Sequence, residues 1–329
     1  MTTTLCVGNA QIIGARPEQQ DAFGFTDKDD DRFVSHGGLA AVVADGMGGH
    51  AGGREASQIA VKAFLQHYMA KPEHSTIPDA LFLAFQAANR AVCTFAESTG
   101  EAGNCGTTLV AAVVHPATLT LHWIGAGDSR LYLFRYPDWV VMTIDTNYGN
   151  QLLGNHIRGL SLYDALDAEF HSLGLTSFLG LEPLTEIDRS LRGFNLHEND
   201  WIILCTDGVY NTLNQEEMTD CLIDNPQMAC ESLIKAVSSK NLTYQDNATV
   251  AIIACDFEAD KQLHETKGSQ RRVLILKLGI GLSLISVFAI IFLVGVYLGK
   301  SCASDRQVGL WGQIRSTFIC VNTHLKRRD

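Results

Sequence analysis

Residues 39–50 read LAAVVADGMGGH, an apolar run that ends in an Asp-Gly pair and a glycine-rich turn. A short run of Val, Ala and Leu bounded by glycine predicts a buried β-strand over 39–44, with Asp45 directly after it. A single Asp-Gly pair is most often only a turn, because both residues tolerate turn conformations. Its meaning therefore depends on whether other aspartates occupy the same kind of position.

Four further aspartates occupy positions comparable to that of Asp45. Each lies beside an apolar run or a turn: Asp128 follows LHWIGAG (121–127), Asp207 follows WIILCT (201–206), Asp246 precedes the run TVAIIAC (249–255), and Asp21 follows RPEQQ (16–20). Because strand ends gather at one rim of a sheet, we expect these carboxylates to lie close together. At short range their negative charges repel one another, so a positive charge is needed to compensate them. Divalent cations provide it, and an all-oxygen set suits Mg²⁺ or Mn²⁺ better than zinc.

The remaining chain is predicted to hold many strands and few helices. Apolar runs predict strands over 5–12, 39–44, 108–114, 119–124, 130–134, 139–143, 201–205 and 249–255. Apolar residues at i, i+3 and i+4 predict helices over 54–68 and 79–97, with shorter ones over 216–223 and 228–237. Strands and helices do not alternate, which favours two packed sheets flanked by helices.

Charge is divided unevenly along the chain. Residues 1–260 hold 14 Lys+Arg and 33 Asp+Glu, a balance of −19, whereas residues 261–329 hold 11 and 3, a balance of +8. The net negative charge of residues 1–260 argues against nucleic-acid binding, because nucleic-acid phosphates need cationic side chains. We expect one folded domain over 1–256, a polar linker with a basic end over 257–277, and a short basic tail over 299–329.

Between linker and tail lies LGIGLSLISVFAIIFLVGVYL, residues 278–298, a run of 21 residues without a charge. Its length matches a helix that crosses the hydrocarbon core, and its lack of polar periodicity argues against a buried helix of a soluble domain. The first residues lack the basic and apolar regions of a secretory signal, so we expect residues 1–260 to stay in the cytosol. The prediction is a single-pass protein of the cell membrane with its tail on the far side.

Six short motifs occur in order along the folded part: RPEQQD (16–21), VADGMGGH (43–50), GTT (106–108), GDSR (127–130), CTDG (205–208) and DNAT (246–249). Together they resemble the motifs of the metal-dependent type 2C (PPM) serine/threonine protein phosphatases, especially the bacterial branch, over residues 5–256. The resemblance implies an α+β fold, a four-layer αββα sandwich of two antiparallel sheets with helices outside each. It also implies hydrolysis of phosphoserine and phosphothreonine on proteins, in opposition to a Ser/Thr kinase.

The resemblance assigns ligands to two tightly held Mg²⁺ or Mn²⁺ ions. Asp45 would bridge the two ions, and the Gly46 carbonyl would be a further ligand. Asp207 and Asp246 would complete the first site, and Asp21 would hold waters of the second. A water that bridges two such cations has a lowered pKa and can attack phosphorus while the cations neutralise the phosphoryl oxygens.

Two further residues receive roles from the resemblance. Asp128, together with Asp207, would bind a third and weaker ion, although its position also fits a turn residue that caps local backbone N–H groups. Arg16 would clamp the substrate phosphate, since a guanidinium binds phosphate in a bidentate manner. The alternative for Arg16 is a surface arginine paired with a nearby acid.

Departures from the family pattern concern proton donation and substrate access. Met47 stands where eukaryotic members carry a general-acid His, so the proton for the leaving oxygen would come from another group. The segments TIDTN (143–147) and TSFLG (176–180) lack a His and an Arg that the family usually carries. Both border the region that corresponds to the flap, about 147–182, which governs substrate access.

Two other functions use the same residues. A pseudophosphatase would be a membrane-tethered module that binds phosphoproteins without cleaving them, but inactive relatives usually lose metal ligands, and Asp45, Asp207 and Asp246 are all present. A hydrolase of a small phosphate ester would use the same site as a protein phosphatase. Phosphopeptides assayed against sugar phosphates distinguish these functions.

Overall fold

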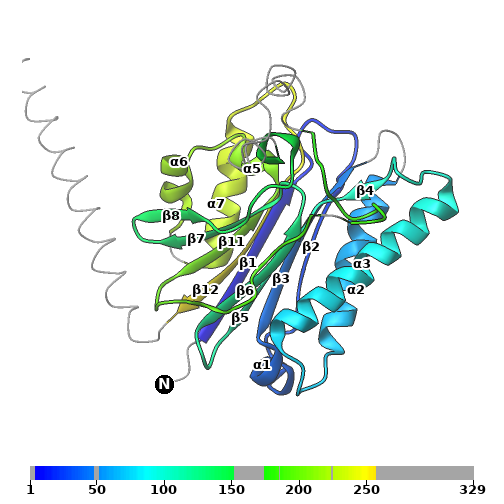
Figure 1. Cartoon of the computed structure of the whole chain (residues 1–329). Coiled ribbons are helices and arrows are strands. Elements are labelled where there is room, and N and C mark those ends of the chain that lie inside the picture. The colour runs from blue at the N-terminus through cyan, green and yellow to red at the C-terminus, as the bar shows by residue number, and fades with distance from the viewer. Residues whose placement is uncertain (1–3, 48–51, 152–173, 185, 224, 257–329) are drawn as a thin grey trace, which may run out of the picture. The chain divides into compact units, whose positions relative to one another are not determined.

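The computed structural model describes residues 4–47, 52–151, 174–184, 186–223 and 225–256 (Figure 1). The predicted linker, membrane span and tail (257–329) and the middle of the predicted flap (152–173) lie outside these residues. Within the described ranges, no helix is long and apolar enough to cross a membrane. The span over 278–298 therefore stays a prediction.

Two antiparallel sheets form the core. The first has the order β1-β12-β11-β7-β8, and the second has the order β10-β6-β5-β3-β2, with β4 beside β3 and β9 beside β6. The first contains β1 (Thr4–Ile12), β7 (Arg130–Arg135), β8 (Asp138–Val141), β11 (Trp201–Cys205) and β12 (Ala248–Asp256). The second contains β2 (Asp21–Phe25), β3 (Leu39–Met47), β4 (Gly106–Thr107), β5 (Leu109–His115), β6 (Thr120–Ala126), β9 (Asp188–Arg189) and β10 (Phe194–Asn195).

The central strands are apolar on both faces, so each sheet packs against its partner sheet and against helices. In β3, Ala41 and Val43 lie in the core between the sheets, whereas Val42 and Ala44 belong to the core under the helices. All four are fully buried. A strand buried on both faces has no polar alternation, which is why β3 reads as a continuous apolar run.

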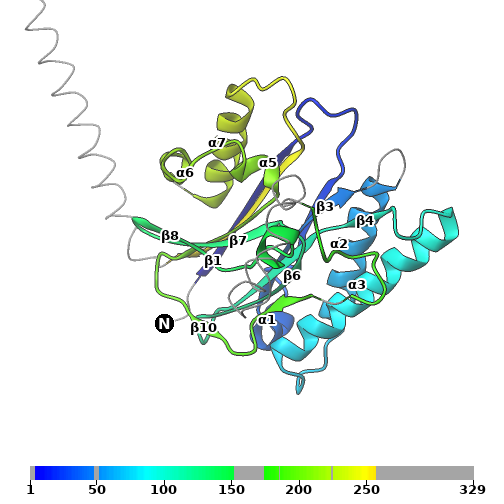
Figure 2. The ribbon, with the colours of Figure 1, turned by 45° about the horizontal axis from the view of Figure 1, so that its top comes forward.

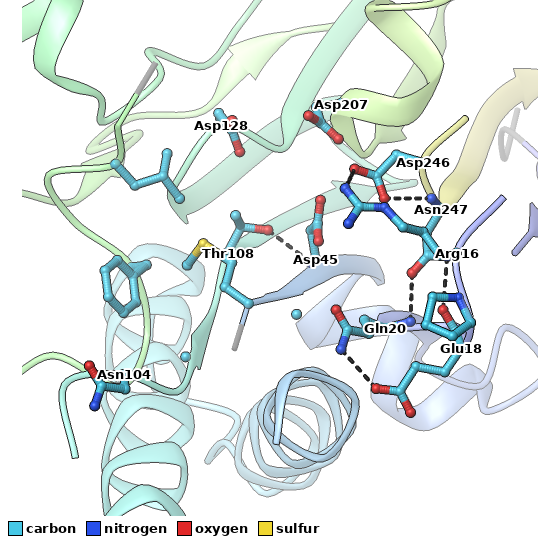
Figure 3. Close-up of a pocket in the computed structure, with 16 residues that line it drawn as sticks. Arg16, Glu18, Gln20, Asp45, Asn104, Thr108, Asp128, Asp207, Asp246 and Asn247 are labelled. Carbon is cyan, nitrogen blue, oxygen red and sulfur yellow. Dashed lines mark hydrogen bonds and ion pairs between the residues drawn. The ribbon is translucent and has the colours of Figure 1, made fainter. Parts of the chain in front are cut away.

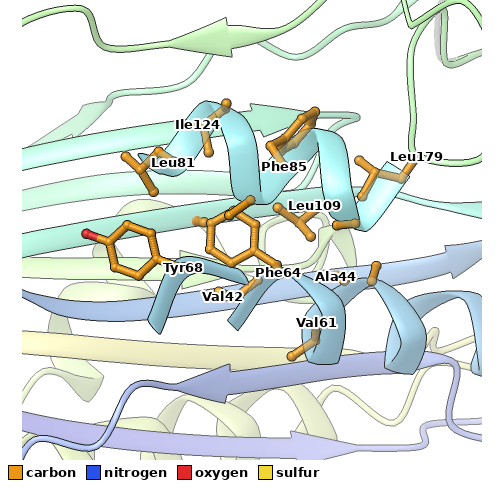
Figure 4. Packing of buried hydrophobic residues seen from close by; sticks show 14 of the residues in the cluster. Val42, Ala44, Val61, Phe64, Tyr68, Leu81, Phe85, Leu109, Ile124 and Leu179 are labelled. Carbon is orange, nitrogen blue, oxygen red and sulfur yellow. The ribbon is translucent and has the colours of Figure 1, made fainter. Parts of the chain in front are cut away.

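Helices α2 (Gly53–Met69) and α3 (Ile77–Thr99) cover the outer face of the second sheet (Figures 1 and 4). Phe64 and Tyr68 of α2 and Phe85 of α3 are fully buried in one cluster with Val42 of β3. The Tyr68 hydroxyl donates a 2.6 Å hydrogen bond to the Gly37 carbonyl, so burial of this ring leaves no polar atom unpaired.

Three helices cover the outer face of the first sheet: α5 (Asp207–Tyr210), α6 (Gln215–Cys221) and α7 (Pro226–Ser239) (Figure 2). Leu233 and Val237 of α7 are fully buried in one cluster with Ile203 of β11 and Ile252 of β12. Helices therefore lie outside both sheets, and the predicted α+β sandwich is confirmed for the described residues.

All the predicted strands and helices are present, with ends that differ by a few residues. The elements that sequence patterns did not predict are short: α1 (Asp31–Gly37), α5, β2, β4, β9 and β10. Short elements carry too few residues for a periodic signal, and tertiary contacts decide their conformation.

Candidate active site

A pocket of about 610 Å³ opens at one end of the two sheets (Figure 3). Four of the five predicted aspartates line it, namely Asp45, Asp128, Asp207 and Asp246, together with Arg16. They come from five separate segments of the chain, so the predicted convergence of strand ends is present for these four. Asp21 is not part of the lining.

Asp45 is held through its backbone, near the end of β3. Its N–H donates to the Thr108 hydroxyl at 2.9 Å, and its carbonyl accepts from the Thr108 N–H and the Thr107 hydroxyl, each at 2.8 Å. The carboxylate points into the pocket (Figure 3). At Gly46 an added Cβ would collide with the Gly53 carbonyl, so only glycine allows the chain to pass there.

Asp207 and Asp246 approach Asp45 from the first sheet. Asp207 follows β11 as the first residue of α5, and its Oδ2 accepts from the Asn211 side chain at 3.2 Å. Among the described residues, its buried Oδ1 has no hydrogen-bond partner. Asp246 precedes β12 and pairs with Arg16 at 2.6 Å, with the two side chains 37% and 57% exposed.

Asp21 lies deeper than the four aspartates that line the pocket. It begins β2, pairs in register with Asp45 and is only 4% exposed. Its Oδ2 accepts from the hydroxyls of Thr206 at 2.9 Å and Thr249 at 2.7 Å, whereas its Oδ1 has no partner in the described part of the chain. Asp21 therefore lies buried beneath the pocket and not on its surface, because long-range hydroxyl donors fix it there.

Burial and mutual repulsion raise the pKa values of these carboxyl groups. Burial, with a smaller contribution from the charge of the nearby Asp207, raises the pKa of Asp21 to about 7 and that of Asp128 to about 6. The pKa of Asp45 is raised well above its usual range, first by burial and then by the charge of Asp21. Such a cluster favours cations, because a divalent ion removes the repulsion that opposes joint ionisation.

The donor set fits Mg²⁺ or Mn²⁺. Carboxylate and carbonyl oxygens are the ligands of such ions, and one buried carboxylate oxygen each of Asp21 and Asp207 has no hydrogen-bond donor in the part of the chain that the structure describes. Within the described ranges, however, no three His, Cys, Asp or Glu side chains form a closed cluster around one point. Asp246 instead turns toward Arg16.

Comparison with known proteins places these residues in a family. A family model described as protein phosphatase 2C matches residues 13–239. The chain belongs to the protein phosphatase 2C family. The predicted enzyme class, a serine/threonine protein phosphatase that hydrolyses phosphoric monoesters, is thereby confirmed at the level of the family.

Relatives agree with this membership. The serine/threonine phosphatase stp of Listeria welshimeri is 28% identical over 215 residues, covering 64% of this chain and 82% of that protein. The solved PPM Ser-Thr phosphatase MsPP from Mycobacterium smegmatis, in complex with cacodylate, is 26% identical, with a TM-score of 0.58, covering 75% of this chain and 97% of that one. The catalytic domain of PstP in complex with two manganese ions is 25% identical, with a TM-score of 0.58, covering 77% and 100%.

The structure of this phosphatase also shows supporting residues that sequence reasoning missed. Asn247 fixes the loop that carries Arg16: its Oδ1 accepts from the Gln20 N–H at 2.7 Å, and its Nδ2 donates to the carbonyls of Ile13 at 2.7 Å and Glu18 at 3.1 Å. The position of Asn247 directly after Asp246 is the feature of the sequence that could have identified it. Phe178 and Leu175, from the border of the predicted flap, also line the pocket.

Proposed function

We propose that this phosphatase hydrolyses phosphoserine and phosphothreonine on proteins, with Mg²⁺ or Mn²⁺ in the pocket, at the cytosolic face of a membrane. The observation that carries the proposal is the convergence of Asp45, Asp128, Asp207 and Asp246 on one open pocket with Arg16 beside it. The names of the bacterial relatives, which are serine/threonine phosphatases, support the substrate class.

The residues of the pocket divide between holding cations and holding phosphate. When bound, two divalent cations supply a nucleophile at neutral pH and neutralise the phosphoryl oxygens. Asp45, Asp207 and Asp246 would hold these two ions, with the Gly46 carbonyl, and Asp21 would hold waters of the second ion from beneath the pocket. The solved PstP domain in complex with two manganese ions supports the number and kind of ions. Met47 lines the pocket with a side chain that carries no transferable proton.

Arg16 is placed to bind the phosphoryl group. It lines the pocket on a loop that Asn247 fixes, and more than half of its side chain is exposed. Its guanidinium bonds Asp246 through Nη2 only, so other N–H groups remain for an incoming phosphate. The arginine would thus orient the phosphate at the edge of the carboxylate cluster.

Replacing Arg16 tests this role. Arg16→Ala is expected to raise KM for a phosphopeptide and to lower kcat/KM by roughly ten- to a hundredfold, because charge-assisted bonds to phosphate are lost. Arg32→Ala is the matched control, since Arg32 is an exposed arginine whose ion pair is with Glu73. Equal kcat/KM values for both variants would show that Arg16 is a surface residue without a substrate contact.

The substrate class is tested by comparing esters. Phosphoseryl and phosphothreonyl peptides are expected to release phosphate with Mn²⁺ present, at a kcat/KM well above that of sugar phosphates. Preference for sugar phosphates would establish the small-ester hydrolase. Tight binding of phosphopeptides without any release of phosphate from either substrate class would establish the pseudophosphatase.

The location at a membrane is supported by the uncharged run 278–298, which is long enough to cross the hydrocarbon core as a helix. The full chain is expected to stay in the membrane fraction after a carbonate wash, whereas residues 1–260 alone are expected in the supernatant. Protease added outside sealed cells should cut the tail at Arg306, Arg315 or Lys326 and spare the catalytic domain. Digestion of the domain with protection of the tail would contradict the proposed orientation.

A further inference from the structure

Tyr210 connects two carboxylates of the pocket. It is the last residue of α5, the short helix that begins at Asp207, and its hydroxyl donates a 2.9 Å hydrogen bond to the main-chain carbonyl of Asp128. The bond joins residues that are 82 positions apart. Because it uses the carbonyl, the Asp128 carboxylate remains in the lining of the pocket, near that of Asp207 (Figure 3).

The ring of Tyr210 is fixed by Arg130. The Arg130 guanidinium carbon lies 3.8 Å from the centre of the ring, a cation–π distance. Arg130 itself is held by Asp145, to which Nε donates at 3.1 Å and Nη2 at 2.8 Å. This ion pair is mostly shielded from solvent, with the two side chains 29% and 9% exposed, so the arrangement is well defined.

The Asp128 loop is also held from its other side. The residue after Asp145, Thr146, accepts from the Gly127 N–H through its hydroxyl at 2.7 Å and donates its own N–H to the Gly127 carbonyl at 2.9 Å. Thr146, in the segment 143–147 at the border of the predicted flap, therefore fixes Gly127, while Tyr210 fixes Asp128. Two consecutive residues of this loop are held by contacts outside the strand that precedes them.

The geometry points to Tyr210 as a positioning residue that sets the Asp128 carboxylate against Asp207, so that the pair holds a weakly bound divalent cation. The inference rests on the proposed function, since it concerns the cations of that site. A purely structural hydrogen bond would stabilise the fold without altering the binding of one particular ion. The affinity of the weak ion therefore separates the two roles.

The test counts Mn²⁺ ions bound to the full purified chain, using electron paramagnetic resonance of free Mn²⁺. The wild type is expected to show tight sites and one weaker site. Tyr210→Phe keeps the ring under Arg130 and loses only the hydroxyl, so the Kd of the weak site should rise roughly five- to tenfold, with the tight sites unchanged. Tyr132→Phe is the matched control, because its hydroxyl accepts a 3.3 Å bond from Arg130 in the same network and does not contact Asp128.

An unchanged Kd of the weak site in Tyr210→Phe, or the same rise in Tyr132→Phe, would overturn the inference. A wild type without any weaker site would overturn it as well. Loss of the tight sites in Tyr210→Phe would show that the hydroxyl supports the whole pocket and not Asp128 in particular. Phosphate release from a phosphopeptide by the wild type is measured separately, and its absence, with Mn²⁺ binding intact, would count against the proposed function alone.

Discussion

Asp45→Asn and Asp207→Asn are each expected to lower phosphate release from a phosphopeptide by roughly a thousandfold or more. Each change removes a charged group that would hold a divalent cation, and the bound cations would supply several kcal/mol of transition-state stabilisation. A chelator such as EDTA should have the same effect on the wild type, and added Mn²⁺ should restore only the wild type. The measurement is the steady-state rate at saturating phosphopeptide.

Two controls keep this result specific. Asp138→Asn changes an exposed aspartate at the start of the edge strand β8 and should leave the rate unchanged. Thermal unfolding should show that both pocket variants remain folded, since no apolar group is removed from the core. Full activity of the wild type in EDTA would rule out the metal-dependent mechanism.

The second large effect concerns the stability of the chelator-treated protein. Burial raises the pKa of Asp21 from 3.8 to about 7 and that of Asp128 to about 6. In the unfolded chain both groups ionise near pH 4, so folding carries a penalty that grows as pH rises from about 4 and is complete above about 7. The free energy of unfolding is therefore expected to fall by on the order of 3 kcal/mol between pH 5 and pH 7.5.

Asp21→Asn isolates the contribution of Asp21. An amide oxygen still accepts from Thr206 and Thr249, but it carries no charge, so the variant should be more stable than the wild type at pH 7.5 and similar to it at pH 4.5. The comparison with the variant is needed because burial lowers the pKa of His122. This histidine therefore makes both proteins less stable as pH falls, which opposes the effect of Asp21. Added Mn²⁺ should raise the stability of the wild type at pH 7.5. Parallel pH curves for the two proteins, from urea unfolding, would contradict the assigned burial of the Asp21 charge.

Much of the pocket could be predicted because its signals are local. Asp45, Asp128 and Asp207 each follow an apolar run and Asp246 closely precedes one, and the ends of adjacent strands meet at one edge of a sheet whatever the length of the connections. The long helices α2 and α3 were predictable for the same reason, since their apolar faces repeat over several turns.

The parts that could not be predicted depend on contacts between distant residues. β2 reads DAFGF, a five-residue strand interrupted by a glycine, and nothing in it shows that Thr206 and Thr249 would bury Asp21. The hydrogen bond from Tyr210 to the Asp128 carbonyl likewise joins two segments whose proximity only the packed sheets establish. Sequence patterns place a residue on an element, and the packing decides which donors reach it.

The central claim is that the pocket holds the divalent cations on which phosphate release depends. Anomalous diffraction at the manganese absorption edge, from crystals grown with Mn²⁺, tests it most directly. Two peaks are expected beside the Asp45 carboxylate, one of them also in contact with Asp207 and Asp246, and both should be lost or strongly reduced in Asp45→Asn. A preparation that releases phosphate from phosphopeptides, yet shows no anomalous peak in this pocket, would contradict the claim.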